Sequence, residues 1–178
     1  MKTFKMTIAG LERELPICEV NEHLDIAAFV MFSDVEMTVN CAKELLKKAP
    51  EHDIILTAES KGIPLAYEMA KQEGKNYVLA RKSAKLYMTN PIEVKVKSIT
   101  TAKVQTLFID ELDKQRLDGK RVLIVDDVIS TGESLSALEE LVAHTNAKIV
   151  GKMAVLAEGD AAERNDIIYL EPLPLFFK

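Results

Sequence analysis

Several common signals are missing from this chain of 178 residues. No apolar run approaches the ~20 residues needed to cross a bilayer, and the first fifteen residues include acidic side chains but no apolar core of signal-peptide length. Cys18 and Cys41 are too few for a disulfide framework and match no zinc-binding spacing. We therefore expect a single-domain, cytoplasmic protein with reduced thiols and no membrane contact.

Positive charge is also scarce. The chain has 23 Lys and Arg residues against 28 Asp and Glu residues, a formal net charge of −5. This balance disfavours a nucleic-acid partner held by bulk charge, although a local basic patch can still bind phosphates. The sequence contains neither G-x-x-x-x-G-K-[ST] nor G-x-G-x-x-G. A P-loop is therefore excluded, and a dinucleotide-binding fold has no fingerprint here.

Strand-like and helix-like segments alternate along the chain. Short apolar runs predict strands at 53–57, 77–80, 121–125, 148–156 and 167–170. Helical spacing of apolar residues predicts helices at 34–49, 62–72 and 133–144. Ser33 and Glu36 fit a capping box for the first helix, and Pro50 ends it. The alternation predicts an α/β fold with a mostly parallel sheet flanked by helices, and ligands should bind at the carboxyl ends of its strands.

The clearest strand runs directly into a chemically rich turn, VLIVDDVISTGES at 122–134. Two carboxylates, Asp126 and Asp127, precede a small hydroxyl-rich turn and a helix. Free backbone N–H groups at a helix N-terminus suit a phosphate. The carboxylates suit sugar hydroxyls or Mg²⁺, which prefers oxygen ligands. Taken alone, the acid pair has a simpler alternative, a cap on an ordinary turn.

This segment resembles the phosphoribosyl pyrophosphate (PRPP) binding motif of the type I phosphoribosyltransferases. The order of the other pieces extends the resemblance from about Ala28 to Leu156. It implies the type I phosphoribosyltransferase fold in one domain, 1–178, with a core at about 33–166 and a small hood from about 1–32 and 167–178. A mobile flap hairpin is implied at 87–103, where alternating residues from Ile92 onward suit an exposed strand or hairpin. Glu93 and Lys103 are the candidates for its catalytic group, with a surface role as the alternative.

The resemblance also assigns roles around the motif. Asp126 and Asp127 would bind the ribose hydroxyls at the reacting centre and are our catalytic candidates. The loop that wraps the 5′-phosphate corresponds to Ser130, Thr131, Gly132, Glu133 and Ser134. Val128 would pack against the base, and Phe29 is the candidate for stacking on it, with packing in the hood core as the alternative.

Two further turns would bind pyrophosphate. The first is Glu59, Ser60, Lys61 and Gly62, a strand-to-helix turn with a cation at its tip. Lys61 stands where many adenine-type members carry Arg, which changes a bidentate contact into a point charge. The second turn supplies Arg81, Lys82 and Lys85. The alternatives are an ordinary βα turn for the first and a solvated charge run for the second.

The implied activity is a purine phosphoribosyltransferase of purine salvage. It would transfer the 5-phosphoribosyl group of PRPP to N9 of a purine, with Mg²⁺ held mainly by PRPP and water near Asp126 and Asp127. Hypoxanthine–guanine members carry Asp where this chain has Ser130, so we expect adenine, with xanthine as the alternative. The family implies a homodimer. A non-catalytic PRPP-binding regulator and an α/β domain with a coincidental acid pair remain as rival interpretations.

Overall fold

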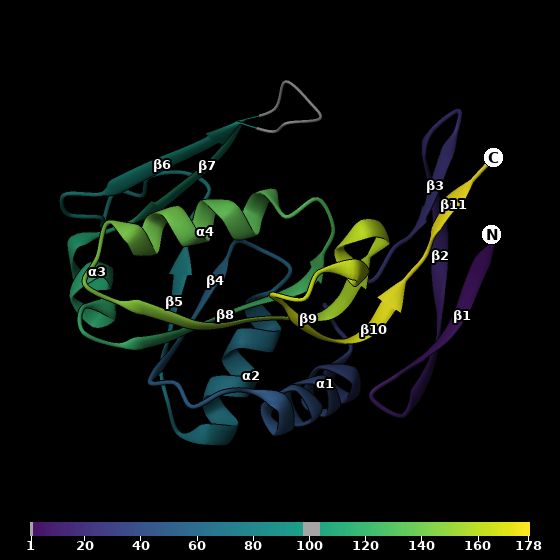
Figure 1. Ribbon diagram of the computed structural model, residues 1–178, viewed down its shortest axis with the longest axis horizontal. Helices are drawn as coiled ribbons and strands as arrows, with labels where there is room; N and C mark the ends of the chain where they lie inside the picture. Colours follow the sequence, from purple (N-terminus) through teal and green to yellow (C-terminus); the bar gives the residue numbers. More distant parts are fainter. Residues whose placement is uncertain (1, 98–103) are drawn as a thin grey trace.

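The core of the molecule is a parallel sheet. A computed structural model describes residues 2–97 and 104–178 (Figure 1). Five parallel strands lie in the order β10-β9-β8-β4-β5. Their bounds are β4 Ile54–Ala58, β5 Tyr77–Ala80, β8 Arg121–Ile129, β9 Lys148–Glu158 and β10 Ile168–Leu173. The predicted α/β class and parallel sheet are confirmed.

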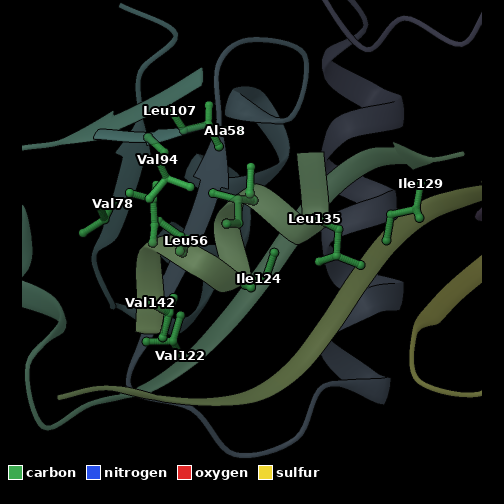
Figure 2. Packing of buried hydrophobic residues seen from close by; sticks show 14 of the residues in the cluster. Leu56, Ala58, Val78, Val94, Leu107, Val122, Ile124, Ile129, Leu135 and Val142 are labelled. Atoms are coloured by element: carbon green, nitrogen blue, oxygen red, sulfur yellow. The ribbon is translucent and has the colours of Figure 1, made fainter. Parts of the chain in front are cut away.

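Helices cover both faces of this sheet (Figure 1). Helices α1 (Val35–Lys48) and α2 (Ile63–Glu73) pack on one face, and α4 (Glu133–Ala143) packs on the other. A short helix, α3 (Glu111–Leu117), lies beside β5, and a 3₁₀ turn, η1 (Gly159–Glu163), follows β9. Figure 2 shows Leu56 and Ile124 of the strands packed near Leu135 of α4. Burial on both faces explains the near-continuous apolar runs of β4 and β8.

The two ends of the chain meet in a second sheet. Strands β1 (Thr3–Ile8), β2 (Leu11–Asn21), β3 (Leu24–Ala27) and β11 (Leu175–Phe177) pair antiparallel in that order. We call this the terminal sheet, and it joins the two segments assigned to the hood. The assigned boundary differs from the structure, because residues 168–173 form β10 and extend the central sheet beside β9. Within the described ranges, no helix is long and apolar enough to cross a membrane.

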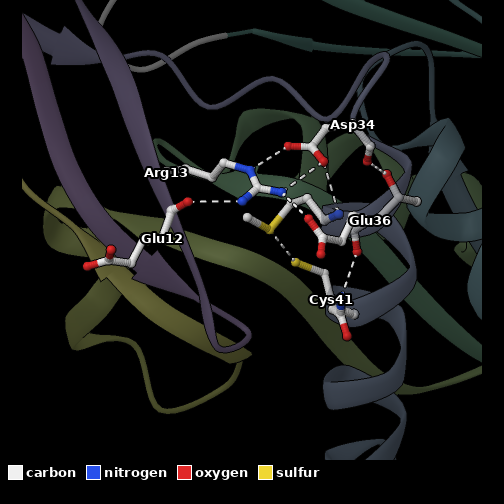
Figure 3. Close-up of polar contacts among 8 residues, drawn as sticks. Glu12, Arg13, Asp34, Glu36 and Cys41 are labelled. Carbon is white, nitrogen blue, oxygen red and sulfur yellow. Dashed lines mark hydrogen bonds and ion pairs between the residues drawn. The ribbon is translucent and has the colours of Figure 1, made fainter.

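The start of α1 differs from the predicted capping box. Asp34, not Ser33, is the N-cap, and its Oδ1 accepts a hydrogen bond from the Met37 backbone N at 3.0 Å. Arg13 of β2 reaches Asp34 at 2.8 Å and Glu36 at 3.0 Å (Figure 3). The Ser33–Glu36 box is therefore wrong, because the Glu36 side chain is engaged by Arg13. This cluster ties the terminal sheet to α1.

Residues 92–109 form the predicted hairpin in their described part. Strands β6 (Ile92–Lys97) and β7 (Val104–Ile109) pair antiparallel. One face is buried rather than exposed, because Val94 and Leu107 pack in the cluster that contains α4 (Figure 2). Glu93 pairs with Lys95 at 3.3 Å. Lys103 lies outside the described residues.

Candidate active site

Two adjacent carboxylates, Asp127 buried and Asp126 half-buried, stand at the centre of the site. Strand β8 continues past its predicted end to Ile129, so Asp126 and Asp127 lie within the strand rather than after it. The Asp127 backbone N donates to Asp126 Oδ1 at 2.8 Å, and Asp127 is only 2% exposed. Burial, and then the nearby charge of Asp127, raises the pKa of Asp126 well above its ordinary value. The pair therefore favours ligands that donate hydrogen bonds or carry positive charge.

The first predicted pyrophosphate loop presses against this pair. It spans Glu59 to Gly62 between β4 and α2, and its Glu59–Ser60 peptide bond is cis. A Cβ on Gly62 would lie 2.7 Å from Thr57 Oγ1 and 3.0 Å from Asp126 Oδ1, so glycine permits the close approach. Lys61 Nζ lies 3.3 Å from Asp127 Oδ2. The structure thus places a cation of this loop beside the acid pair.

Glu59 joins the two predicted pyrophosphate loops to each other. Its Oε2 accepts a hydrogen bond from the Lys82 backbone N at 2.9 Å and lies 3.2 Å from Arg81 Nε. These contacts lower the pKa of Glu59. A carboxylate repels a diphosphate, so the Glu59 side chain holds the basic loop in place rather than offering itself as an anion ligand. Arg81 also donates to the Tyr87 hydroxyl, and Lys85 Nζ donates to Ser83 Oγ at 2.7 Å.

One cavity of about 410 Å³ gathers residues from three separate segments of the chain. It lies between the first pyrophosphate loop, the acid pair and the start of α4. Its predicted site residues are Glu59, Ser60, Lys61, Lys82, Asp126, Asp127, Val128 and Ser134. A larger cavity of about 490 Å³ beside β5 and α3 contains Arg81 but neither Asp126 nor Asp127. Of the predicted pyrophosphate ligands, Arg81, Lys85 and Gly62 do not line the cavity that contains Asp126 and Asp127.

The predicted phosphate loop follows β8 and opens α4. Gly132 is the N-cap with φ of 79°, a left-handed conformation that favours glycine. No side chain hydrogen-bonds to the backbone at this N-cap, and the N-terminal end of a helix suits an anion. A small cavity of about 110 Å³ is lined by all five predicted phosphate-loop residues together with Asp126 and Val128. The phosphate loop and the acid pair therefore adjoin.

Two residues beside the phosphate loop, Glu158 and Arg164, were not predicted from the sequence. Ser130 Oγ donates to Glu158 Oε1 at 2.8 Å. Arg164 lies over Gly132, where its Nη1 would be 2.7 Å from an added Cβ. Neither Glu158 nor Arg164 belongs to a recognisable sequence motif. Their positions follow from the pairing of β8 with β9, which a βαβ pattern predicts in outline but not in register.

Phe29, the candidate for stacking on a base, has another place in the structure. It is 4% exposed and packs in the cluster that includes Ile8, Leu15 and Met31. It lines none of the cavities around the acid pair or phosphate loop. Packing in the core, the alternative weighed for this residue, describes its position.

The carboxylates at the site are too few for a protein-only metal centre. Among residues 2–97 and 104–178, no group of three His, Cys, Asp or Glu side chains is arranged to hold a metal ion. The buried Oδ2 of Asp127 accepts no hydrogen bond from the described residues, although Lys61 lies nearby. That oxygen suits a ligand hydroxyl or a metal-bound water.

Comparison with known proteins agrees with this arrangement. Residues 38–171 match the model of a family described as the phosphoribosyl transferase domain. The chain belongs to this family. The match covers the acid pair, both pyrophosphate loops and the phosphate loop, so the resemblance predicted from VLIVDDVISTGES is confirmed.

Relatives within the family carry different names. The adenine phosphoribosyltransferase of Rhodococcus jostii is 33% identical over 126 residues, 71% of this chain and 69% of that protein. The xanthine phosphoribosyltransferase of Alkaliphilus metalliredigens is 31% identical over 151 residues, 83% and 74% of the two chains. The purine biosynthesis transcriptional repressor PurR of Bacillus subtilis is 28% identical over 113 residues, 64% of this chain and 39% of the repressor.

A solved structure supports the fold. Adenine phosphoribosyltransferase from Thermoanaerobacter pseudethanolicus superposes with a TM-score of 0.68 at 23% identity, covering 80% of this chain and 84% of that one. At this identity the likeness establishes the fold alone. The type I phosphoribosyltransferase fold is therefore confirmed.

Proposed function

We propose that this protein transfers the 5-phosphoribosyl group of PRPP to N9 of adenine, in the cytoplasm, as a step of purine salvage. The observation that carries the proposal is the cavity of about 410 Å³, which gathers the acid pair, Lys61, Lys82 and Ser134 beside the phosphate loop. A cation-bearing loop, paired acids and an anion-binding turn match the diphosphate, the ribose and the 5′-phosphate of PRPP.

In this proposal each part of the site acts on one part of PRPP. The first turn of α4 binds the 5′-phosphate through backbone N–H groups and the hydroxyls of Ser130, Thr131 and Ser134. The ribose hydroxyls donate to Asp126 and Asp127, which relieves the repulsion between the two neighbouring carboxylates. Val128 packs against the base, since it lines both the phosphate-loop cavity and the cavity of about 410 Å³ that contains the acid pair.

The reaction replaces one bond at C1′ with another. The bond from C1′ to the pyrophosphate oxygen breaks with its electron pair on pyrophosphate, and purine N9 bonds to C1′ and loses its proton. Lys61 and Lys82 stabilise the negative charge that develops on the leaving group. Asp126 and Asp127 orient the ribose and stabilise the positive charge that develops on the sugar.

We further propose that Mg²⁺ enters with the diphosphate of PRPP. Asp126 and Asp127 would hold it through bound waters, for which the buried Oδ2 of Asp127 is suited. When bound, the ion neutralises charge on the departing pyrophosphate.

One feature favours adenine or xanthine over hypoxanthine and guanine, and a second favours adenine over xanthine. Ser130 replaces the Asp that the resemblance places there in hypoxanthine–guanine members. Four relatives named adenine phosphoribosyltransferase, among them that of Rhodococcus jostii, are 32–35% identical to this chain, against 31% for the xanthine-named relative. Xanthine is the second candidate base.

We also propose that the protein acts as a homodimer. Val35 and Tyr67 are 74% and 55% exposed on the adjoining helices α1 and α2. They border an apolar cavity of about 270 Å³ that also contains Val39 and Pro64. Sedimentation equilibrium tests this proposal, and a single species of 19.8 kDa would contradict it.

A turnover assay tests the proposed reaction. Purified protein is incubated with Mg²⁺, PRPP and each of adenine, xanthine, hypoxanthine or guanine, and pyrophosphate release is followed. We expect rapid release with adenine. Preference for xanthine would support the second base, and preference for hypoxanthine or guanine would contradict the inference from Ser130. PRPP binding without turnover would favour a regulator, which the likeness to the repressor makes the rival function.

A further inference from the structure

Lys61 lies at the tip of the first pyrophosphate loop and faces the acid pair. Its Nζ is 3.3 Å from Oδ2 of Asp127, and its side chain is half-exposed, whereas Asp127 is buried. Both residues line the cavity of about 410 Å³. A cation that reaches solvent therefore offsets the charge of a carboxylate that does not.

The contact between Lys61 and Asp127 is loose. Among the described residues, Asp127 Oδ2 has no hydrogen-bond partner, so Lys61 Nζ is close enough for charge attraction but is not aligned to donate. An ion pair with one exposed partner contributes little to stability. The long, flexible lysine side chain lets its ammonium reach other acceptors. Lys61 can therefore leave Asp127 at small cost when another anion is near.

Lys82 is a second cation of the same cavity, and its contacts differ from those of Lys61. Its backbone N donates to Glu59 Oε2 at 2.9 Å. Within residues 2–97 and 104–178, the Lys82 ammonium forms no ion pair with a carboxylate. The two lysines thus carry the same charge into one cavity, but Lys61 is the one that contacts the acid pair.

The contact of Lys61 bears on which sugar phosphates bind, if the site binds PRPP as proposed above. The ribose hydroxyls donate to Asp126 and Asp127, so they occupy the oxygen that Lys61 faces. The diphosphate of PRPP brings negative charge to the loop that carries Lys61. Ribose 5-phosphate has the same ribose and 5′-phosphate but lacks the diphosphate. When it binds, Lys61 loses Asp127 and gains no other anion.

We propose, on the basis of that function, that Lys61 selects ligands with a diphosphate by exchanging Asp127 for this group. PRPP replaces one weak ion pair with charge-assisted contacts to its diphosphate. A ligand with the ribose alone must break the pair without forming another. The reverse exchange promotes product release: once pyrophosphate has left, Lys61 returns to Asp127 and competes with the ribose of the nucleotide.

Calorimetric titrations of PRPP and of ribose 5-phosphate, at one Mg²⁺ concentration, test this exchange. In Lys61→Gln, PRPP binding should weaken about tenfold or more, because charge-assisted contacts are lost. Ribose 5-phosphate should bind the same variant about two- to five-fold more tightly, because the ion pair no longer competes for Asp127. The two changes have opposite signs, which neither misfolding nor a general loss of positive charge produces.

Lys82→Gln is the matched control. It removes the same charge from the same cavity and leaves the contact between Lys61 and Asp127 in place. It should weaken PRPP binding without strengthening the binding of ribose 5-phosphate. Lys61→Arg keeps a cation beside Asp127, so its affinity for ribose 5-phosphate should stay within about two-fold of the wild type.

The outcomes distinguish the exchange from the proposed function. Ribose 5-phosphate that binds Lys61→Gln no more tightly than the wild type would overturn the role of Lys61 and leave the PRPP site intact. If Lys61→Gln does not fold, a crystal structure of the wild type with Mg²⁺ and PRPP decides. Lys61 Nζ on the diphosphate would support the exchange, and Nζ still against Asp127 would overturn it. Absence of PRPP binding to the wild type would overturn the proposed function, and the exchange with it.

Discussion

Gly62 is the position where one added carbon should separate the pyrophosphate loop from the acid pair. Its conformation, φ of −79°, is ordinary for any residue, so Gly62→Ala introduces a clash rather than backbone strain. The new Cβ would lie 2.7 Å from Thr57 Oγ1 and 3.3 Å from the Asp126 Cα. Both neighbours belong to buried strands, so the loop must move. Overpacking of this kind costs about 1–3 kcal/mol of unfolding free energy.

The functional effect should exceed the loss of stability. A displacement of about 1 Å in a positioning group can cost about 10²-fold in activity. We expect PRPP affinity and turnover to fall together, as measured by calorimetry and pyrophosphate release, while urea unfolding gives the stability. Thr57→Ala removes the closest contact, so the double variant should recover part of the loss.

The control is Gly74→Ala at the other end of α2. Gly74 has φ of 65° with open space around a Cβ, so this change introduces strain of about 1–2 kcal/mol without a clash. It should lower stability and leave PRPP affinity unchanged. Gly62→Ala protein that binds PRPP as tightly as the wild type would refute the reasoning.

Two further predictions concern groups outside the cavity. The Arg13 guanidinium lowers the pKa of Asp34 below its ordinary 3.8, so this pair stabilises the fold above that pH, and the contribution is lost as the pH falls through the lowered pKa. Asp34→Asn keeps a capping side chain, so its deficit in unfolding free energy should be largest near neutral pH and shrink in acid; a deficit independent of pH would contradict this. Burial raises the pKa of Cys41 to about 12, whereas Cys18 is exposed. Iodoacetamide should therefore modify the folded protein at Cys18 alone, and mass spectrometry showing Cys41 modified at the same rate would contradict the buried position.

Much of the central sheet could be predicted from the sequence because strands buried on both faces are continuous apolar runs. The run 77–80 matches β5, and 121–125 marks the start of β8. The end of β8 was harder, because Asp126 and Asp127 are polar residues within a strand whose pairing with β9 continues to Ile129. The spacing of Ser33 and Glu36 predicts Ser33 as the cap, but Asp is an equally good cap, and the Met37 backbone N donates to Asp34.

The terminal sheet and the contact between Ser130 and Glu158 could not be predicted for a different reason. β2 mixes charged and apolar residues without strict alternation, and β11 has only three residues. Glu158 and Ser130 are distant in the chain, and a side-chain hydrogen bond between two strand ends leaves no sequence pattern. Phe29 shows the limit of a resemblance, since its place in the chain suggested a base contact and its side chain lies in the core.

The central claim is that the acid pair, the pyrophosphate loop and the phosphate loop form one PRPP site. Calorimetric titration of PRPP with Mg²⁺ into the wild type and Asp127→Asn tests it most directly. We predict saturable, Mg²⁺-dependent binding to the wild type, weakened about tenfold or more in the folded variant, because hydrogen bonds to a charged acceptor contribute about 1.5–3 kcal/mol. No binding to the wild type, or equal binding to both proteins, would contradict the claim.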